Sequence, residues 1–342
     1  MSESKEKQPL LKIDDLHVSF LTYAGKVQAV RGVSLSMQEG EILAIVGESG
    51  CGKSVTAQTI LQLNPSPPSV VEAGSIELEG RDLLQLDDAK MRAIRGHEIS
   101  MIFQDPMTSL NPTMRIGKQI MEAILKHQKV TKKEAYDRAV EMLRLVGLSN
   151  PEQRMKQYPF EFSGGMRQRA MIAMALVCRP KILIADEPTT ALDVTIQSQI
   201  VDLMLDLRQK LKTAILIITH DMGVVADIAD RVAVMYAGLV VEKGDVQEIF
   251  YHPKHPYTWG LLDSIPRPDT HGERLIPIEG APPDLIAPPK GCPFAARCDY
   301  AMKICHEQMP EITAEGDHEV RCWLCHEFAP KVVNRYTEGK EG

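Results

Sequence analysis

Gly47-Glu48-Ser49-Gly50-Cys51-Gly52-Lys53-Ser54 decides the fold of this 342-residue chain. The apolar run 42–46 comes directly before this stretch, and residues 55–63 after it are compatible with a helix. A strand, a glycine loop and a helix in this order form a cradle for nucleotide phosphates, because glycines let backbone N–H groups turn toward phosphate oxygens. The lysine adds positive charge at the β- and γ-phosphates, and the serine can ligate magnesium. The sequence therefore predicts a nucleoside triphosphate site.

The nucleotide contacts of this site are expected from the loop and the first turn after it. These residues are Gly47, Ser49, Gly50, Cys51, Gly52, Lys53, Ser54 and Val55. The positive potential of such a loop is also expected to lower the pKa of the Cys51 thiol and make it reactive.

Composition limits the class of protein. The chain is 44% hydrophobic and 25% charged, which is typical of a soluble globular protein, and its formal net charge of −7 argues against general nucleic-acid binding. Residues 1–8 are polar with no apolar run behind them, and no apolar stretch reaches the length of a membrane span. We expect a protein inside the cell that meets a membrane only through another protein.

The pattern along the chain predicts an α/β fold with several parts. Residues 10–46 alternate apolar and polar side chains, as half-buried strands of a β subdomain do. Apolar residues recur at three- and four-residue spacings over 115–157, which indicates a helical insertion, here assigned to a helical subdomain of about 107–170. Helix and strand patterns then alternate from residue 170 to 218, which predicts a parallel sheet with crossover helices.

A pair of carboxylates follows the strand 181–185 of this sheet. Asp186 and Glu187 are expected at the carboxyl edge, where the phosphate loop also lies. Asp186 can hold magnesium, and Glu187 can accept a proton from an attacking water. Taken alone, the segment would also fit a solvated acidic turn.

A second glycine motif, Phe162-Ser163-Gly164-Gly165-Met166-Arg167-Gln168-Arg169, comes 23 residues before Asp186. A serine cap and exposed backbone donors at the positive end of a helix can bind an anion, although alone they mark only a helix start. With this motif the chain resembles the ATP-binding cassette (ABC) ATPases. Their signature is Leu-Ser-Gly-Gly-Gln, so the phenylalanine and methionine here are departures.

The resemblance implies a P-loop cassette with a β subdomain, a RecA-like parallel-sheet core and a helical subdomain. It assigns catalytic roles to Glu187, to Gln104 in Phe103-Gln104-Asp105-Pro106, and to His220 in Thr219-His220-Asp221. Asp193 in Ala191-Leu192-Asp193 matches the loop that communicates between two cassettes. The adenine-stacking aromatic corresponds to Tyr23, with Phe20 as the alternative. The implied magnesium ligands are Ser54, Gln104 and Asp186.

The same resemblance implies a head-to-tail pair of cassettes. The phosphate loop of one chain then faces Ser163, Gly164, Gly165 and Met166 of its partner. One chain with one loop and one signature completes neither ATP site by itself.

The region beyond residue 250 has a different amino-acid composition. Residues 251–290 carry nine prolines, and five of the seven cysteines follow. Thiols stay reduced in the cytoplasm, so clustered cysteines point to metal. From chemistry alone, an iron–sulfur cluster and tetrahedral zinc suit four thiolates equally well.

This tail, together with His255-Pro256-Tyr257-Thr258-Trp259 and Phe103-Gln104-Asp105-Pro106-Met107, resembles the oligopeptide and dipeptide ABC importer ATPase subunits. That resemblance implies an ATPase that energises peptide uptake from the cytoplasmic face of the membrane. Its implied partners are a related but distinct second ATPase, two membrane permeases and, indirectly, a solute-binding protein. It divides the chain into a nucleotide-binding domain, 8–262, and a proline- and cysteine-rich extension, 263–330.

In that family four tail cysteines hold a four-iron four-sulfur (4Fe-4S) cluster. They map to Cys292, Cys298, Cys305 and Cys322, with zinc as the alternative cofactor. Cys325 could replace Cys322 or be spare.

Two other functions stay open at this point. Nickel or another small solute could be the cargo, because no residue of an ATPase subunit reads it. A soluble cassette protein acting on ribosomes or nucleic acid is the second, but such chains usually carry two cassettes or long coiled coils. A single phosphate loop, no heptad run and a negative net charge favour the importer.

Overall fold

The computed structural model describes residues 8–104, 109–189, 193–265 and 278–332. It consists of two compact units, each of which is described by itself. The first unit contains Met1–Leu10, Met37–Ile42 and Leu83–Ile218, and the second contains Leu11–Ser36, Leu43–Asp82 and Thr219–Gly342.

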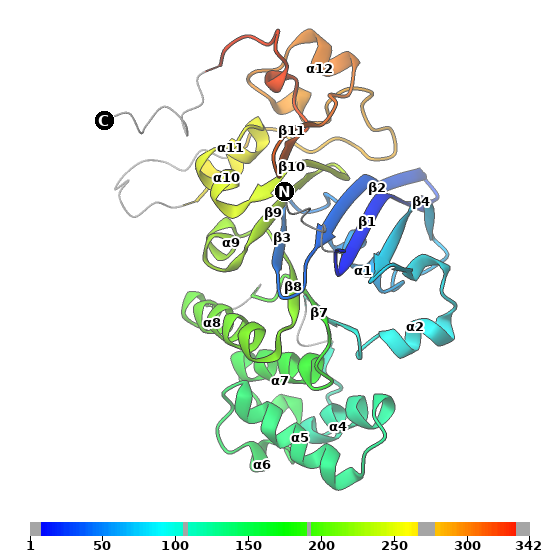
Figure 1. Cartoon of the computed structure of the whole chain (residues 1–342), viewed down its shortest axis with the longest axis vertical. Coiled ribbons are helices and arrows are strands. Elements are labelled where there is room, and N and C mark those ends of the chain that lie inside the picture. The colour runs from blue at the N-terminus through cyan, green and yellow to red at the C-terminus, as the bar shows by residue number, and fades with distance from the viewer. Residues whose placement is uncertain (1–7, 105–108, 190–192, 266–277, 333–342) are drawn as a thin grey trace, which may run out of the picture. The chain divides into compact units, whose positions relative to one another are not determined.

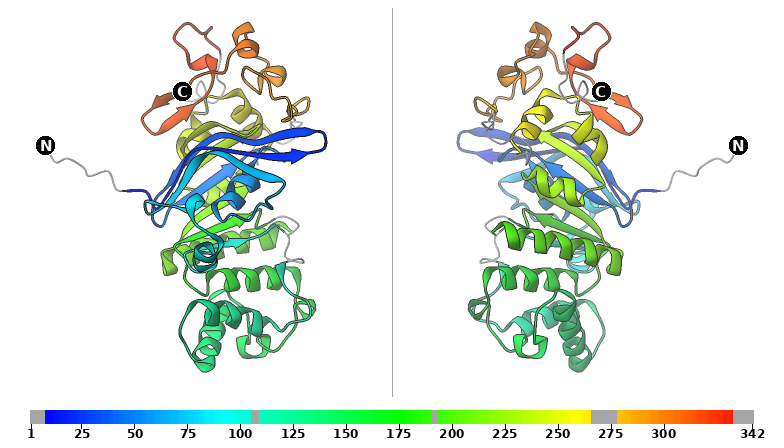
Figure 2. Two further views of the ribbon diagram at one scale, coloured as in Figure 1. Left: turned by 90° about the vertical axis from the view of Figure 1, so that its right-hand side faces the viewer. Right: turned by 90° about the vertical axis from the view of Figure 1, so that its left-hand side faces the viewer.

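An antiparallel sheet opens the second unit. Its strands β1 (Leu11–Thr22), β2 (Gly25–Met37), β4 (Ser69–Leu78) and β5 (Arg81–Asp82) lie in the order β2-β1-β4-β5. The long β1–β2 hairpin is clear in Figure 2. In the β1–β4 pair Leu11 lies opposite Leu78 and Ile13 opposite Ile76, so apolar residues share the buried face.

The second unit also contains the strand that leads into the phosphate loop. β3 (Ile42–Val46) runs parallel to β9 (Arg231–Tyr236), which pairs antiparallel with β10 (Leu239–Asp245). Helices α1 (Lys53–Ile60), α9 (Met222–Ile228), α10 (Val246–Tyr251) and α11 (Pro256–Asp263) belong to this unit. All five residues of β3 are buried, as the unbroken apolar run predicted.

The first unit contains three parallel strands. β7 (Ile182–Asp186) lies between β6 (Ile99–Ile102) and β8 (Ala214–Thr219), and α8 (Val194–Leu211) connects β7 to β8. A turn η1 (Leu83–Gln85) and α2 (Asp88–Ile94) precede β6. The parallel sheet and crossover helix predicted from the alternating pattern are thus confirmed.

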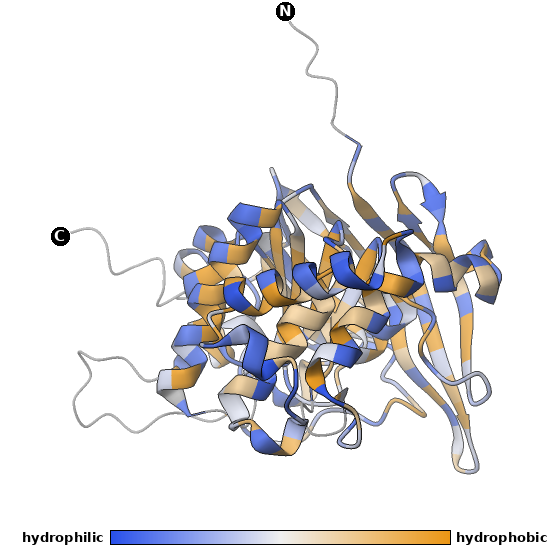
Figure 3. Ribbon diagram, turned by 90° about the horizontal axis from the view of Figure 1, so that it is seen from below, coloured by the Kyte–Doolittle hydropathy of each residue, from blue (hydrophilic) through white to orange (hydrophobic). Residues whose placement is uncertain are grey.

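A group of helices completes the first unit (Figure 1). It contains α4 (Ile116–His127), α5 (Lys132–Leu145), α6 (Pro151–Arg154), the turn η2 (Pro159–Glu161) and α7 (Gly164–Leu176). The apolar positions that predicted helices, such as Ile120, Ile124 and Ala139, are buried. Seen from below, helices of the chain alternate hydrophilic and hydrophobic stretches, as one-sided burial requires (Figure 3). None of the helices within the described ranges is long and apolar enough to cross a membrane.

The C-terminal residues join the sheet of the second unit. β12 (His318–Val320) pairs with β10 and with β11 (Thr313–Glu315). Three short elements lie nearby in the chain: η3 (Ala295–Arg297), α12 (Lys303–Glu307), which contains Cys305, and η4 (Trp323–Cys325), which contains Cys325. His318 Nε2 lies 2.8 Å from a carboxylate oxygen of Glu242 on β10, and both side chains are almost fully buried. This pairing could not be predicted from the sequence, because β12 is only three residues long.

His255, at the start of α11, is a neutral buried imidazole. Its Nδ1 accepts a hydrogen bond from Tyr257 N at 3.0 Å, while its Nε2 has no hydrogen-bond partner. The ring packs against Phe294, with ring centroids 5.9 Å apart. Burial lowers the pKa of His255 from 6.5 to about 4, against a smaller opposing effect of Glu242.

This shift predicts a loss of stability in acid. Unfolded His255 takes up a proton below about pH 6.5, whereas the folded chain does so only near pH 4, so protonation favours the unfolded state within this window. We expect His255 alone to lower the unfolding free energy by about 2 kcal/mol between about pH 7 and pH 5. His255→Asn keeps an acceptor for Tyr257 N but cannot titrate there. Urea unfolding at both pH values should show a smaller difference for this variant, and an equal difference would contradict the assignment.

Candidate functional site

The phosphate loop of the second unit converges on the Lys53 ammonium. The ammonium donates hydrogen bonds to Gly47 O at 2.8 Å and Glu48 O at 2.9 Å, and Lys53 is 5% exposed. Gly52 caps α1, which begins at Lys53, and Thr56 Oγ1 bonds back to Gly52 O. A cation therefore lies at the N-terminal end of a helix, where the helix dipole also favours an anion.

Two glycines of the loop leave no room for a side chain. A Cβ on Gly47 would lie 2.2 Å from Met235 O of β9, and one on Gly52 would lie 2.3 Å from Ala29 O of β2. Both residues have positive φ, 149° and 98°. The loop therefore requires glycine at both positions for space and for backbone conformation.

The prediction for the Cys51 thiol was wrong. Cys51 is buried, and this desolvation raises its pKa more than the Lys53 ammonium lowers it. The thiol is a packed side chain of the loop, and Gly47 lies against its sulfur.

In the first unit the structure brings two predicted catalytic residues together. Gln104 Nε2 donates a hydrogen bond to Glu187 Oε2 at 2.8 Å. Asp186, the last residue of β7, is buried, and Glu187 follows with a positive φ of 47°. Glu187 N donates to Ile218 O at 2.8 Å, which holds this bend against β8. The carboxylate thus has a fixed partner at the end of the parallel strands.

The second glycine motif begins α7, also in the first unit. Ser163 is the N-cap, and its hydroxyl accepts from Met166 N at 3.4 Å. Gly164 has open space at its Cβ position, which leaves the helix start accessible.

Sequence reasoning missed Gln168 of this helix. Its side chain is 2% exposed, and Nε2 donates to Pro188 O at 2.6 Å. The signature helix is thereby tied to the residue after Glu187. A buried glutamine followed by arginine has no sequence pattern that would reveal this contact.

The other predicted residues have separate places. His220, the residue after β8, is exposed and belongs to the second unit. Tyr23 is fully exposed in the β1–β2 turn, whereas Phe20 is half-buried within β1. Asp193 caps α8 by accepting from Ile196 N at 2.9 Å. Residues 191 and 192 of the same loop lie outside the described residues.

Comparison with known proteins decides the family. The model of the family described as "ABC transporter" matches residues 30–190, and that of "Oligopeptide/dipeptide transporter, C-terminal region" matches residues 241–305. The "Oligopeptide transport ATP-binding protein OppD" of Bacillus subtilis (strain 168) is 60% identical over 94% of this chain and 91% of its own. The "Dipeptide transport ATP-binding protein DppD" of the same organism is 56% identical over 95% and 98%. The chain belongs to the ATP-binding subunits of peptide ABC transporters.

Solved structures agree on the fold. A dimeric ATP-binding cassette, MJ0796, bound to ADP and phosphate has a TM-score of 0.62 at 26% identity, covering 69% of this chain and 98% of its own. The cbiO1 subunit from Clostridium perfringens has a TM-score of 0.61 at 27% identity, covering 72% and 92%. The predicted ABC cassette is confirmed, and the peptide relatives remove support for a nickel or nucleic-acid protein.

The five tail cysteines of this peptide-transporter ATPase lie in the second unit. Cys292 N donates to Cys305 O at 2.7 Å, and a Cβ on Gly291 would lie 2.2 Å from that same oxygen. Burial first, and then Cys292 and Cys305, raise the pKa of Cys298 to about 11. Burial and then Cys325, Cys292 and Cys298 raise the pKa of Cys322 well above its ordinary value.

The predicted metal site itself gains no support from this arrangement. Over the described ranges, no group of three or more His, Cys, Asp or Glu side chains is placed to hold a metal ion.

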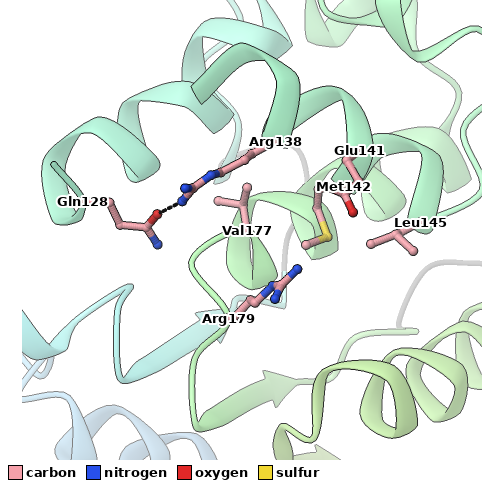
Figure 4. Close-up of a pocket in the computed structure, with 7 residues that line it drawn as sticks. All are labelled: Gln128, Arg138, Glu141, Met142, Leu145, Val177 and Arg179. Carbon is pink, nitrogen blue, oxygen red and sulfur yellow. Dashed lines mark hydrogen bonds between the residues drawn. The ribbon is translucent and has the colours of Figure 1, made fainter. Parts of the chain in front are cut away.

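Two hollows lie among the helices of the first unit. A cavity of about 310 Å³ is shown in Figure 4, with the Arg138 side chain bonded to Gln128 and Arg179 on the opposite side. A groove of about 970 Å³ is lined by residues from the segment 114–126, by Lys132 and Tyr136 of α5, and by Met155 and Lys156, which follow α6. Neither contains a predicted nucleotide contact.

Proposed function

We propose that this subunit hydrolyses ATP to drive a membrane importer of oligopeptides or dipeptides. The observation that carries the proposal is the hydrogen bond between Gln104 and Glu187 at the end of β7, in a chain whose phosphate loop centres on the Lys53 ammonium. A carboxylate held by an amide is a proton acceptor with a fixed direction. A positively charged ammonium in a loop at the N-terminus of a helix attracts the negatively charged phosphates.

The predicted residues have the following roles in this reaction. Glu187 accepts a proton from the water that attacks the γ-phosphate, and Gln104 orients that carboxylate and the water. Lys53 stabilises the charge on the phosphates, and His220 orients the γ-phosphate. Ser54, Gln104 and Asp186 would hold magnesium, because all three offer the oxygen donors that this ion prefers, and the ion would neutralise phosphate charge. Tyr23, exposed on its turn, offers a flat face to adenine.

A Glu187→Gln variant tests the assignment. Because the amide keeps the size of the side chain but cannot take up the proton, we expect ATP hydrolysis to fall at least about 100-fold. ATP affinity should stay within about threefold, since the phosphate loop is unchanged. Phosphate release and binding of a fluorescent ATP analogue measure the two effects.

The same variant tests the pairing of cassettes, since bound ATP that is not split should hold two subunits together. Light scattering with magnesium ATP should detect a pair formed by the variant alone or with a related ATPase, and a Lys53→Ala variant is the control that should stay single. Normal hydrolysis by Glu187→Gln would remove Glu187 from its role.

A second cassette completes the ATP site in this proposal. The MJ0796 structure is a dimer by its own description. Ser163 and Gly164, at an accessible helix start, would meet the γ-phosphate bound by the partner's loop. We propose a related but distinct chain as this partner, together with two permeases and a solute-binding protein, which places the subunit on the cytoplasmic face of the membrane.

The groove among the helices is the surface proposed for the permease. Three methionines, Met114, Met121 and Met155, are among the residues that line it. Methionine side chains are flexible and can adapt their conformation to an apolar partner. Among the residues that line the groove, Glu122 is acidic and five are basic. The basic residues are Arg115, Lys118, Lys126, Lys132 and Lys156. This surface favours an amphipathic segment with acidic residues.

Charge reversal separates coupling from catalysis. We expect Lys118→Glu combined with Lys126→Glu to lower peptide uptake by cells about tenfold or more, because two attractions become repulsions. ATP binding by the purified subunit should not change, since neither residue belongs to the phosphate loop. Lys133→Glu, next to the groove-lining Lys132 but not a lining residue itself, is the matched control. Equal uptake by all three forms would exclude this docking surface.

We also propose that the extension, 263–330, holds a 4Fe-4S cluster or zinc, and that 8–262 is the nucleotide-binding domain. The backbone bond between Cys292 and Cys305, and the nearness of Cys298 and Cys322 to Cys292, support the four-thiol set. Such thiols would bind iron or zinc as thiolates. Cys325 is close to Cys322 but also to Lys254, Glu242 and Glu315, and we propose it as the spare thiol.

Metal analysis after anaerobic purification tests the set. We expect Cys298→Ser to lose the bound metal, because a hydroxyl is a poor ligand for it, while Cys325→Ser and the buried Cys178→Ser retain it. Iron with equal sulfide and a visible absorption band indicates the cluster, and zinc alone indicates the tetrahedral site. Absence of both metals from the wild-type protein would contradict the proposal.

A further inference from the structure

Arg297, between Cys292 and Cys298 in the C-terminal extension, reaches the phosphate loop of the same unit. Its guanidinium forms a two-pronged ion pair with Glu48, at 2.6 Å from Nη1 to Oε2 and 2.9 Å from Nη2 to Oε1. The Arg297 side chain is 4% exposed and that of Glu48 is 28% exposed. Glu48 lies between Gly47 and Ser49, inside the loop itself.

Every N–H group of this guanidinium has a partner. Besides the carboxylate, Nε donates to Glu279 O at 2.8 Å, Nη2 to Ile278 O at 3.1 Å and Nη1 to the Tyr236 hydroxyl at 3.2 Å. A planar fork with all five donors engaged is fixed in one orientation. The pair with Glu48 accordingly raises the pKa of Arg297 further.

Aromatic side chains enclose the pair. Tyr236 of β9 and Phe294 of the extension pack edge to face, with ring centroids 5.3 Å apart, and the guanidinium lies over both rings. Tyr257 of α11 packs on Tyr236, and its hydroxyl accepts a hydrogen bond from Glu48 N at 2.8 Å. The side chain and the backbone of Glu48 are therefore held by two different parts of the second unit.

The charge of Glu48 is the reason this pair matters. A carboxylate in a loop that binds phosphates would repel them, and low exposure would strengthen the repulsion. Arg297 neutralises that carboxylate at hydrogen-bond distance. Glu48 O also accepts a hydrogen bond from the Lys53 ammonium, so the position of Glu48 affects the lysine that binds the phosphates.

We propose that Arg297 is a positioning residue of the ATP site, through which the cysteine-rich extension controls nucleotide affinity. It acts through Glu48 and does not touch the nucleotide. This inference rests on the proposed function, because it requires the loop to bind ATP. Since Cys292 and Cys298 flank Arg297, any change in the bonding of these thiols would reach the phosphate loop through this ion pair.

A double-mutant cycle on Arg297 and Glu48 tests the proposal, with the affinity of the full-length protein for a fluorescent ATP analogue as the measurement. Arg297→Ala leaves the Glu48 carboxylate unpaired, and we expect the dissociation constant to rise about tenfold or more. Arg297→Lys keeps the charge but loses the fork, so its loss should be smaller. Adding Glu48→Gln to Arg297→Ala removes the repelling charge, and the double variant should bind more tightly than Arg297→Ala alone. A role in folding alone would give additive losses instead.

Two controls complete the experiment. Arg321→Ala removes another part-buried arginine of the extension, whose Nη1 bonds to Pro310 O at 3.4 Å, and it should leave ATP affinity unchanged. Hydrogen exchange should show that the analogue slows exchange at 294–298 in the wild-type protein but not in Arg297→Ala.

The outcomes are distinguishable. No binding by the wild-type protein contradicts the proposed function, whereas wild-type affinity in Arg297→Ala, or losses that add in the double variant, overturns the role of Arg297. If Arg297→Ala does not fold, the Arg297→Lys variant decides the question. This variant keeps the charge but loses the two-pronged geometry, so an ATP affinity equal to that of the wild-type protein would also overturn the role of Arg297.

Discussion

The phosphate loop has one backbone path because its neighbours leave room for no other. Gly47 lies against the backbone of β9 and Gly52 against that of β2, each closer than a Cβ permits. This close approach fixes where the N–H groups of the loop point, and it places the Lys53 ammonium on two loop carbonyls. The anion site is therefore a property of packed backbone, which explains why small changes in the strands around it would be felt at the nucleotide.

The C-terminal extension belongs to that same packing. β12 pairs with β10 next to β9, and the buried Glu242 carboxylate accepts from His318 and from the backbone of Lys254 and His255. Each acceptor position of a desolvated carboxylate needs such a donor. The strand next to β9 is thus paired with residues that come about 80 positions later in the chain, as Glu242 opposite Val320 shows.

What the sequence could predict follows from the range of the interactions. Apolar runs and helical spacings are local, so the strands 42–46 and 182–186 were found almost to their ends. The stretch 115–157 was correctly predicted as helical, but the ends of α4 and α5 within it were not predicted. The meeting of Gln104 and Glu187 was foreseeable from family motifs, since parallel strands end at one edge. The pairing of Glu48 with Arg297 was not, because 249 residues separate them and neither lies in a pattern that names a partner. The pKa of Cys51 was mistaken for a related reason: charge is visible in a sequence, whereas desolvation appears only once the fold buries the thiol.

Glu187 shows how such a site is held together. A residue with a side chain at a φ of 47° costs free energy relative to extended or helical backbone, so the bend persists only if its surroundings impose it. Here Ile218 O holds the Glu187 N–H, Gln104 holds the carboxylate, and Gln168 holds the carbonyl of the next residue, Pro188. These three contacts come from β8, from the segment after β6 and from α7, the helix that starts at the signature serine. A shift of α7 would therefore be transmitted to the bend at Glu187, which links the helix that begins at Ser163 to the proposed proton acceptor within one chain.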